Sequence, residues 1–187
     1  SRHALLWAAA QPAALWQRRL MELMKEELVD IVDDDDHVIG QVTRSQMRRE
    51  LLQHRVVAIL CLNSRGEIFV HRRTATKDLF PSLYDMFVAG TEEAGESYES
   101  AAVRELAEEI GVSGVPLERL FHHLYRGPQT RAHTEVYRVI WDGPIVTQAS
   151  EIAWGEFRSR EGLATNRDGF ELVPDGAELF ARYLELF

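Results

Sequence analysis

The sequence predicts an α/β (α+β) fold in which a mixed β-sheet lies between helices. Three observations favour this fold: short aliphatic runs alternate irregularly with helical patterns, turn residues separate them, and the sequence shows no internal repeats or low-complexity linkers. The chain has 187 residues, of which 45% are hydrophobic, enough for one substantial core. We expect one compact domain over residues 28–187, preceded by a helical extension over residues 1–27.

The N-terminal part of the chain is expected to form a helix and two short strands. Leucine and methionine at three- and four-residue spacing predict the helix over Gln17–Glu27. The strands, Leu28–Val32 and Val38–Val42, flank the acidic run Asp33–Asp36. Because that run lacks the alternating ligands and the glycine of a calcium loop, we interpret it as a solvated turn.

A second helix and a β-hairpin are expected next. Thr43, with Gln46 three residues later, has the pattern of a capping box and begins a helix that runs to about Leu52. Two aliphatic runs, Val56–Leu62 and Ile68–Arg72, are separated by the turn sequence Asn-Ser-Arg-Gly. This arrangement is typical of a hairpin with buried strands.

The remaining elements alternate between strands and helices. A strand over Tyr84–Ala89 leads into a glycine-bounded loop, and a helix then runs from near Ser97 to Ile110, where Gly111 ends it. Further strands are expected at Leu117–Arg126, Glu135–Trp141 and Ile152–Phe157. Asp175 is the expected N-cap of a last helix.

Charge and cysteine content restrict the classes of partner and compartment. Thirty acidic and twenty-one basic residues give a net charge of −9, the wrong sign for a broad nucleic-acid-binding surface. Cys61, the single cysteine, lies in an aliphatic run and is expected to be a buried, inert thiol, which fits a cytoplasmic protein. The apolar stretch Ala4–Trp16 is too short to span a bilayer, so no membrane association is expected.

Residues 90–112 read GTEEAGESYESAAVRELAEEIGV and combine an acidic helical face with an apolar one. At 100° per residue, three glutamates fall within an arc of about 100°, and three aliphatic residues form a neighbouring face directed at the core. The glutamates are Glu105, Glu108 and Glu109, and the aliphatic residues are Val103, Leu106 and Ile110. Like charges on one face repel, so they indicate a bound hard divalent cation, Mg²⁺ or Mn²⁺; a solvated acidic face is the alternative.

This segment resembles the signature of the Nudix hydrolase superfamily at every fixed position. The matching residues are Gly90, Glu96, Arg104, Glu105, Leu106, Glu108, Glu109, Gly111 and Val112. Seven required identities coincide by chance roughly once in 10⁸ starting points at average residue usage. The resemblance implies a Nudix α/β/α sandwich and metal-dependent hydrolysis of a diphosphate bond.

The resemblance also implies roles for individual residues. Glu108 and Glu109 are the first candidates for metal ligands, and Glu105 is a ligand or the base that activates water. Arg104 is expected to tie the loop to the helix by pairing with a glutamate such as Glu96. The backbone carbonyl of Ala89 is a further candidate metal ligand.

A further catalytic carboxylate is expected from outside the signature. Glu151 lies directly before a predicted strand, and Glu135 is its competitor because it aligns with a catalytic glutamate of type I isopentenyl diphosphate isomerases, a branch of the same superfamily. Three other polar residues in or beside these strands, His122, His123 and His133, show no spacing pattern and are assigned structural or surface roles.

The segment upstream of the signature is similar to that isomerase branch, and the similarity covers roughly residues 28–160. It rests on Arg72, Arg73, Lys77 and Pro81. In that branch the second arginine and the lysine grip the diphosphate, so Arg73 and Lys77 are candidate phosphate contacts. Solvated loop cations are the alternative.

Several residues that the isomerase reaction requires are replaced in this chain. The isomerases carry a cysteine directly before the signature glycine and a histidine two residues after that cysteine, where this chain has Ala89 and Thr91. Of two upstream metal-binding histidines, His54 matches the second, but Met47 stands at the first. These departures favour hydrolysis.

The sequence therefore predicts a hydrolase that uses water to cleave a nucleoside diphosphate derivative or a related small diphosphate. An isopentenyl diphosphate isomerase-like enzyme and a non-catalytic nucleotide-binding Nudix module are the alternatives. A homodimer is one expectation from the amphipathic N-terminal segment and from the habit of the family.

Overall fold

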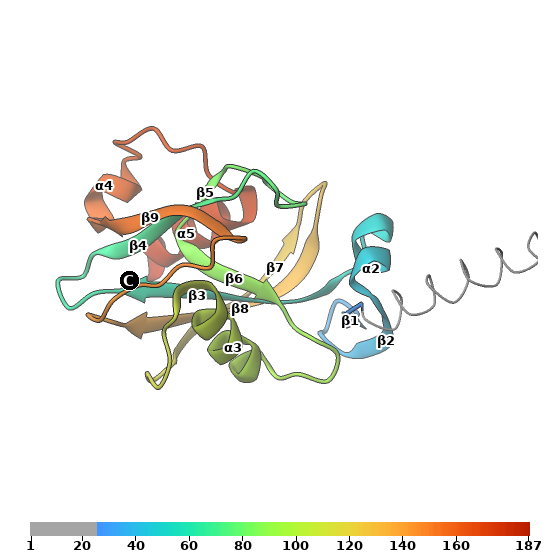
Figure 1. The fold of residues 1–187 in the computed structure, drawn as a ribbon. Coiled ribbons are helices and arrows are strands. Elements are labelled where there is room, and N and C mark those ends of the chain that lie inside the picture. The colour runs from blue at the N-terminus through green and yellow to red at the C-terminus, as the bar shows by residue number, and fades with distance from the viewer. Residues whose placement is uncertain (1–25) are drawn as a thin grey trace, which may run out of the picture.

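The computed structural model describes residues 26–187, so the predicted helix over Gln17–Glu27 lies almost wholly outside the described residues (Figure 1). The strands are β1 (Leu28–Val32), β2 (Val38–Thr43), β3 (His54–Leu62), β4 (Ile68–Arg73), β5 (Tyr84–Asp85), β6 (Phe87–Thr91), β7 (Glu118–Arg126), β8 (Arg131–Ile140) and β9 (Ile152–Arg158). The helices are α2 (Arg44–Glu50), α3 (Tyr98–Ile110), α4 (Arg160–Ala164) and α5 (Pro174–Leu186).

Strand β3 is the centre of a mixed sheet. It pairs antiparallel with β6 on one side and parallel with β8 on the other, and β8 pairs antiparallel with β7. The hairpin to β4 brings in β5 and β9, both antiparallel to β4. Near the start of β3, Ile31 of β1 pairs with His54, which attaches the β1–β2 hairpin to the same sheet.

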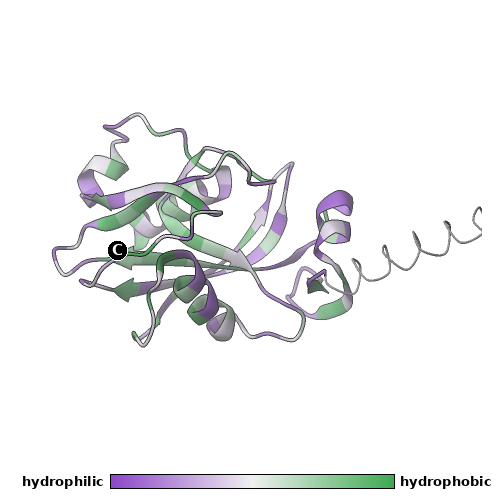
Figure 2. Cartoon of the chain, viewed as in Figure 1, coloured by the Kyte–Doolittle hydropathy of each residue, from purple (hydrophilic) through white to green (hydrophobic). Residues whose placement is uncertain are grey.

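Alternate residues of β3 face two separate cores. Val57, Ile59 and Cys61 pack with residues of α3, whereas Ala58 and Leu60 pack with residues of α5. The two helices therefore cover opposite faces of the sheet, as Figure 1 shows, and the predicted α/β/α sandwich with a mixed sheet is confirmed. Figure 2 shows the hydrophobic residues concentrated on the central strands and hydrophilic residues on α2.

Several predicted elements differ from the observed ones. The strand predicted over Tyr84–Ala89 is two strands, because the chain bends at Met86, where Asp85 Oδ1 accepts the N–H of Phe87 at 3.0 Å. Strand β8 begins at Arg131, four residues before the predicted start. The short helix α4 was not predicted.

The helix ends show which capping predictions hold. Thr43 Oγ1 accepts the N–H of Gln46 at 3.3 Å, but the Gln46 side chain bonds to Glu50, so only half of a capping box forms. Asp175 is not the N-cap of α5: Val173 holds that position and Asp175 lies inside the first turn after Pro174. Pro174 fits the first turn because its nitrogen carries no proton.

The apolar face of α3 also differs from the helical-wheel prediction. Val103 is 48% exposed, and the buried aliphatic residues are Ala101, Ala102, Leu106 and Ile110. Gly111 ends the helix as predicted, with a left-handed φ of 69°. Among the described residues, no helix is long and apolar enough to cross a membrane.

Candidate active site

Helix α3 carries the carboxylates of the predicted metal site. Its N-cap Ser97 accepts the N–H of Ser100 at 3.2 Å, and Gly111 ends it, so the helix begins and ends where residues 90–112 require. Glu105 is 8% exposed and Glu109 is 6% exposed. Glu108, one turn after Arg104 on the same helix, is exposed. Two of the three glutamates are therefore buried.

Strand β6 meets the carboxylate of Glu105 at Gly90. A β-carbon at Gly90 would lie 1.9 Å from Glu105 Cδ, which is shorter than any real contact, so a larger residue here would have to displace the Glu105 side chain. Ala89 precedes it in the strand and pairs with Ala58 of β3. The glycine thus brings the main chain of β6 against a carboxylate of α3.

Arg104 links the loop before α3 to the helix. Its Nε donates to Glu96 Oε1 at 3.0 Å and its Nη2 donates to Glu96 Oε2 at 2.9 Å, so the expected pairing with Glu96 is present. Its Nη1 donates to Glu105 Oε1 at 2.7 Å, and Nη2 also reaches the Thr91 carbonyl. One guanidinium therefore fixes both the loop and the Glu105 side chain.

The buried carboxylates of α3 are electrostatically unfavourable as they stand. Burial, followed by repulsion from Glu105, raises the pKa of Glu109 to about 8. Burial also raises the pKa of Glu105, although Arg104 acts in the opposite direction. A divalent cation would relieve both the desolvation and the repulsion, and a set of carboxylate oxygens suits a hard ion such as Mg²⁺. The residues present therefore fit the metal that the signature implies.

The segment between β8 and β9 brings a further carboxylate to this site. The N–H of Gln148 donates to the Glu109 carbonyl at 2.8 Å, which docks the segment on α3. Glu151 forms an ion pair with Lys77, and the charges of both act on Glu109. Of the two sequence candidates for the additional carboxylate, Glu151 is the one next to the signature glutamates.

Glu135, the other candidate for the additional carboxylate, lies in the β7–β8 hairpin and not beside the signature glutamates. Its Oε1 is 2.6 Å from Arg119 Nε and its Oε2 is 3.2 Å from His122 Nδ1, contacts within the β7–β8 hairpin. In the register of the sheet it pairs with Val57, which pairs on its other side with Gly90, so strand β3 separates Glu135 from the glycine that meets Glu105. The structure does not bring Glu135 together with the signature glutamates.

A pocket lined by cations lies beside Gly90. Its cations are Arg73 and Lys77, which the sequence singled out, together with Arg44 and Arg48 of α2, which it did not. Three carboxyl groups also line it: Asp78, Asp85 and Asp175. Arg73 donates to the Leu79 carbonyl at 3.1 and 3.2 Å, which holds its guanidinium at the pocket. The four-residue spacing of the two α2 arginines was a signal for a shared helical face, but not for the position of that face.

The cations of this pocket are incompletely neutralised. Arg48 Nε lies 3.6 Å from Asp78 and has no hydrogen-bond partner within the described part of the chain. Burial lowers the pKa of Arg48; the charge of Asp78 opposes this shift, whereas the charges of Arg44 and Arg73 add to it. Guanidinium groups that repel one another in a half-buried pocket favour a bound polyanion.

His54 also lines the pocket. Its Nδ1 lies 3.0 Å from the Leu52 carbonyl, which can only accept, so Nδ1 donates and Nε2 is left as an acceptor. Burial lowers the pKa of His54 to about 4, so the ring is neutral at pH 7. Met47, at the other position compared with the isomerases, is buried against Val29 and Ile31.

Comparison with known proteins shows the family to which the chain belongs. The NUDIX domain family model matches residues 52–172. The uncharacterized Nudix hydrolase SCO1686 of Streptomyces coelicolor is 44% identical over 159 residues, which cover 84% of this chain and 88% of the relative. The uncharacterized Nudix hydrolase YfcD of Escherichia coli K12 is 32% identical over 169 residues, 90% of this chain and 91% of the relative.

A solved structure extends the agreement to three dimensions. The crystal structure of DR0079 from Deinococcus radiodurans is 32% identical, has a TM-score of 0.71, and covers 83% of this chain and 98% of its own. The match to more than half of the chain, the curated relatives and the common fold lead to one conclusion: the protein belongs to the NUDIX family and is a Nudix hydrolase.

Proposed function

We propose that the protein hydrolyses the phosphoanhydride bond of a small diphosphate, a nucleoside diphosphate derivative or a related compound. One observation carries the proposal: the buried carboxylates of α3 adjoin the cation-lined pocket. Gly90 lines the pocket and touches Glu105, and the charge of Lys77, another lining residue, acts on Glu109. A metal-binding half and a phosphate-binding half therefore share one boundary.

The metal half consists of Glu105, Glu108, Glu109 and the carbonyl of Ala89, which would hold Mg²⁺ or Mn²⁺. An ion held there would neutralise phosphate oxygens and make the attacking water more acidic. Arg104 holds Glu105 in place from the side of the loop. The proton of the attacking water passes to Glu105 or to Glu151.

The phosphate half binds and orients the substrate. Arg73 ends β4, Lys77 lies on the segment after it, and Arg44 and Arg48 reach the same pocket from α2. Several cations around one diphosphate hold its oxygens in a fixed orientation and compensate their charge. The Lys77–Glu151 ion pair connects this half to the carboxylates of α3.

The contacts around the signature disfavour the two alternative functions. Carbon protonation in the isomerases needs a thiol, whereas Ala89 offers a methyl group and Cys61 is buried in the core beneath α3. Thr91 stands where the isomerases have a histidine, and its backbone carbonyl accepts a hydrogen bond from Arg104. Two buried carboxylates that repel each other destabilise the fold unless they bind a metal ion, and a non-catalytic module does not need that ion. This chain has both carboxylates, Glu105 and Glu109.

The test is a substrate screen combined with a matched set of variants. Nucleoside diphosphate sugars, dinucleotides, nucleoside di- and triphosphates and isoprenoid diphosphates are incubated with the protein and Mg²⁺, and the products are separated. Glu108→Gln/Glu109→Gln should reduce turnover at least about 100-fold, the scale for losing groups that stabilise transition-state charge. Glu99→Gln, on the exposed first turn of α3, is the control and should leave turnover unchanged.

The outcomes separate the candidate functions. Full activity in the Glu108→Gln/Glu109→Gln variant would show that these glutamates do not hold a metal ion needed for turnover. Nucleotide binding without turnover of any compound would indicate a binding module, and conversion of isopentenyl diphosphate to its isomer would indicate an isomerase.

A further inference from the structure

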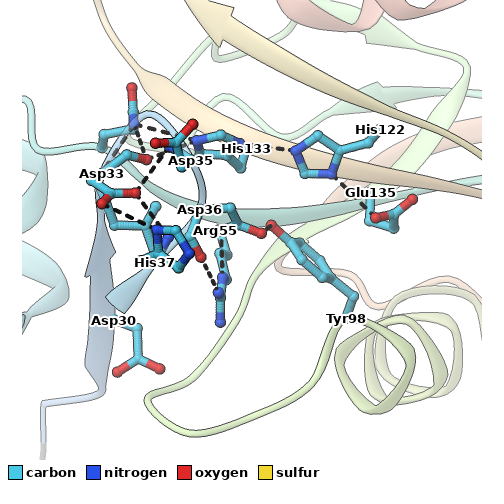
Figure 3. A network of polar contacts seen from close by, with 12 residues as sticks. Asp30, Asp33, Asp35, Asp36, His37, Arg55, Tyr98, His122, His133 and Glu135 are labelled. Carbon is cyan, nitrogen blue, oxygen red and sulfur yellow. Dashed lines mark hydrogen bonds and ion pairs between the residues drawn. The ribbon is translucent and has the colours of Figure 1, made fainter. Parts of the chain in front are cut away.

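Two histidines, neither of which lines the pocket beside Gly90, face each other across the β7–β8 hairpin (Figure 3). His122 Nε2 lies 2.8 Å from His133 Nδ1. The antiparallel register places His122 opposite Glu135 and His133 opposite Leu124, so the two rings are diagonal neighbours on one face. Asp36 reaches the same place from the β1–β2 turn, and one ligand atom from each of the three residues lies within 4.8 Å of the others.

The outer nitrogen of each ring contacts an oxygen. His133 Nε2 is 2.9 Å from the Asp33 carbonyl, which can only accept, so this nitrogen carries a proton. Gln53 Nε2 approaches the same nitrogen at 3.4 Å, but it donates to the Asp33 carbonyl at the shorter distance of 2.7 Å. His122 Nδ1 is 3.2 Å from Glu135 Oε2.

Glu135 acts as an acceptor in that contact. Its other oxygen lies 2.6 Å from Arg119 Nε, so the carboxyl group accepts from a neighbour on each side. His122 Nδ1 therefore also carries a proton. In neutral rings the two inner nitrogens, His122 Nε2 and His133 Nδ1, then direct lone pairs at each other across 2.8 Å. That arrangement is repulsive unless a cation lies between them.

We propose that this cation is a divalent transition-metal ion of the Zn²⁺ type, bound by His122 Nε2, His133 Nδ1 and a carboxylate oxygen of Asp36. Tetrahedral coordination at about 2.0–2.1 Å places two nitrogen ligands a little more than 3 Å apart, so the rings need to separate by only about half an ångström. A water molecule completes the four ligands.

The surroundings of the three ligands are those of a metal site. Metal-binding histidines commonly donate their other ring N–H to a carboxylate or a backbone carbonyl, as His122 does to Glu135 and His133 does to Asp33. Asp36 is oriented by Arg55 Nε, 2.7 Å from Oδ1, and by the Tyr98 hydroxyl, 3.0 Å from Oδ2. Each of its oxygens retains a lone pair for a metal.

Negative charge near the site favours a cation. Asp36 brings a carboxylate beside the two imidazoles. The remaining aspartates of the turn, Asp33–Asp35, add to the negative potential around Asp36.

The nitrogen ligands distinguish this site from the carboxylate cluster of α3. Imidazole suits Zn²⁺ and its neighbours, whereas carboxylate oxygens suit Mg²⁺ and Mn²⁺. The ion would also link two segments, because Asp36 belongs to the β1–β2 turn and the histidines belong to the β7–β8 hairpin. Tyr98 of α3 already donates to Asp36. We therefore expect binding of the ion to stabilise the fold.

The test is a titration of the full chain carrying Glu108→Gln/Glu109→Gln, which removes the cluster on α3, with Zn²⁺ alone. Calorimetry should show one equivalent bound in the presence of millimolar Mg²⁺, and Co²⁺ in place of Zn²⁺ should give the intense absorption of a tetrahedral ion. Adding His122→Gln or Asp36→Asn should weaken Zn²⁺ binding at least about tenfold and abolish the increase in melting temperature on adding Zn²⁺.

His123→Gln is the matched control. His123 lies next to His122 in β7 but contacts Glu178 of α5 at 2.8 Å, on the other face of the strand, so this variant should bind Zn²⁺ normally. Absence of Zn²⁺ binding in the parent would overturn the proposal and leave a proton between the rings. Binding that persists unchanged in both His122→Gln and Asp36→Asn would also overturn it. His122→Gln is suited to this test because its side chain is 31% exposed, so the substitution opens no core cavity.

Discussion

The α-carbon of Gly90 faces the carboxylate of Glu105 with no room for a single additional carbon atom. Gly90→Ala should therefore displace Glu105 from Arg104 and from the metal half of the site, while the strand pairing of β6 is retained. We expect kcat/KM to fall about 100-fold with an unchanged circular dichroism spectrum. Gly40→Ala is the control, because nothing lies within 4 Å of its added β-carbon. Equal activity of the two variants would contradict the assignment of Glu105.

The arginines of α2 provide a test of the phosphate half. Arg48→Ala removes a guanidinium from the pocket, so KM should rise about 10- to 100-fold with a smaller change in kcat, as for a charge-assisted contact to bound substrate. Arg49→Ala changes the neighbouring residue, whose side chain is 67% exposed and pairs with Glu50, and should leave KM unchanged. Steady-state kinetics at two salt concentrations measures both effects. A similar rise in KM for both variants would indicate a general charge effect rather than a pocket contact.

Glu92 should make the fold less stable as the pH rises. Burial raises the pKa of Glu92 to about 8, above the ordinary value of 4.5. The folded protein therefore binds an additional proton between these two pH values, and this group lowers the free energy of unfolding as pH rises through that window. Glu92→Gln removes the effect, so its stability relative to the parent should increase from pH 5 to pH 9 by on the order of 1–3 kcal/mol.

Urea unfolding at the two pH values in the presence of a chelator measures this difference. Glu99→Gln, which changes an exposed carboxylate, should show no such trend. A stability difference for Glu92→Gln that is independent of pH would mean that the Glu92 carboxyl group is not the source.

Cys61 should be unreactive in the folded protein. It is 1% exposed, and burial raises the pKa of its thiol to about 12, so almost no thiolate is present at pH 8. A disulfide reagent should label one thiol rapidly in denaturant and only at the rate of unfolding in buffer. Rapid labelling of the native protein would show that β3 opens locally at this position.

The sequence predicted the parts of the molecule that depend on neighbours along the chain. The helix from Ser97 to Gly111 and the pairing of Arg104 with Glu96 follow from spacing within one segment, and both are present. The prediction that Val103 faces the core was wrong. A helical wheel gives the angle between the acidic and apolar faces, but it does not show which edge of the apolar face packs on the sheet. Ala101 is buried there instead.

Contacts between distant segments could not be predicted in the same way. Asp36 and His133 meet only because β1 joins β3 at His54 and β8 runs parallel to β3, a register that no local pattern encodes. The same holds for Arg48, whose position at the pocket depends on where α2 lies against the sheet. Glu151 and Glu135 were equal candidates until the docking of Gln148 on Glu109 placed one of them beside α3.

Helix α2 lies before residue 52, where the match to the NUDIX family begins. The carboxylates of α3 and two cations of the pocket, Arg73 and Lys77, lie inside the match, whereas Arg44 and Arg48 lie in front of it. In the proposed function, the phosphate half is therefore assembled from both stretches of the chain. Exchanging residues 44–50 between relatives would alter the contribution of α2 to the pocket while α3 stays as it is.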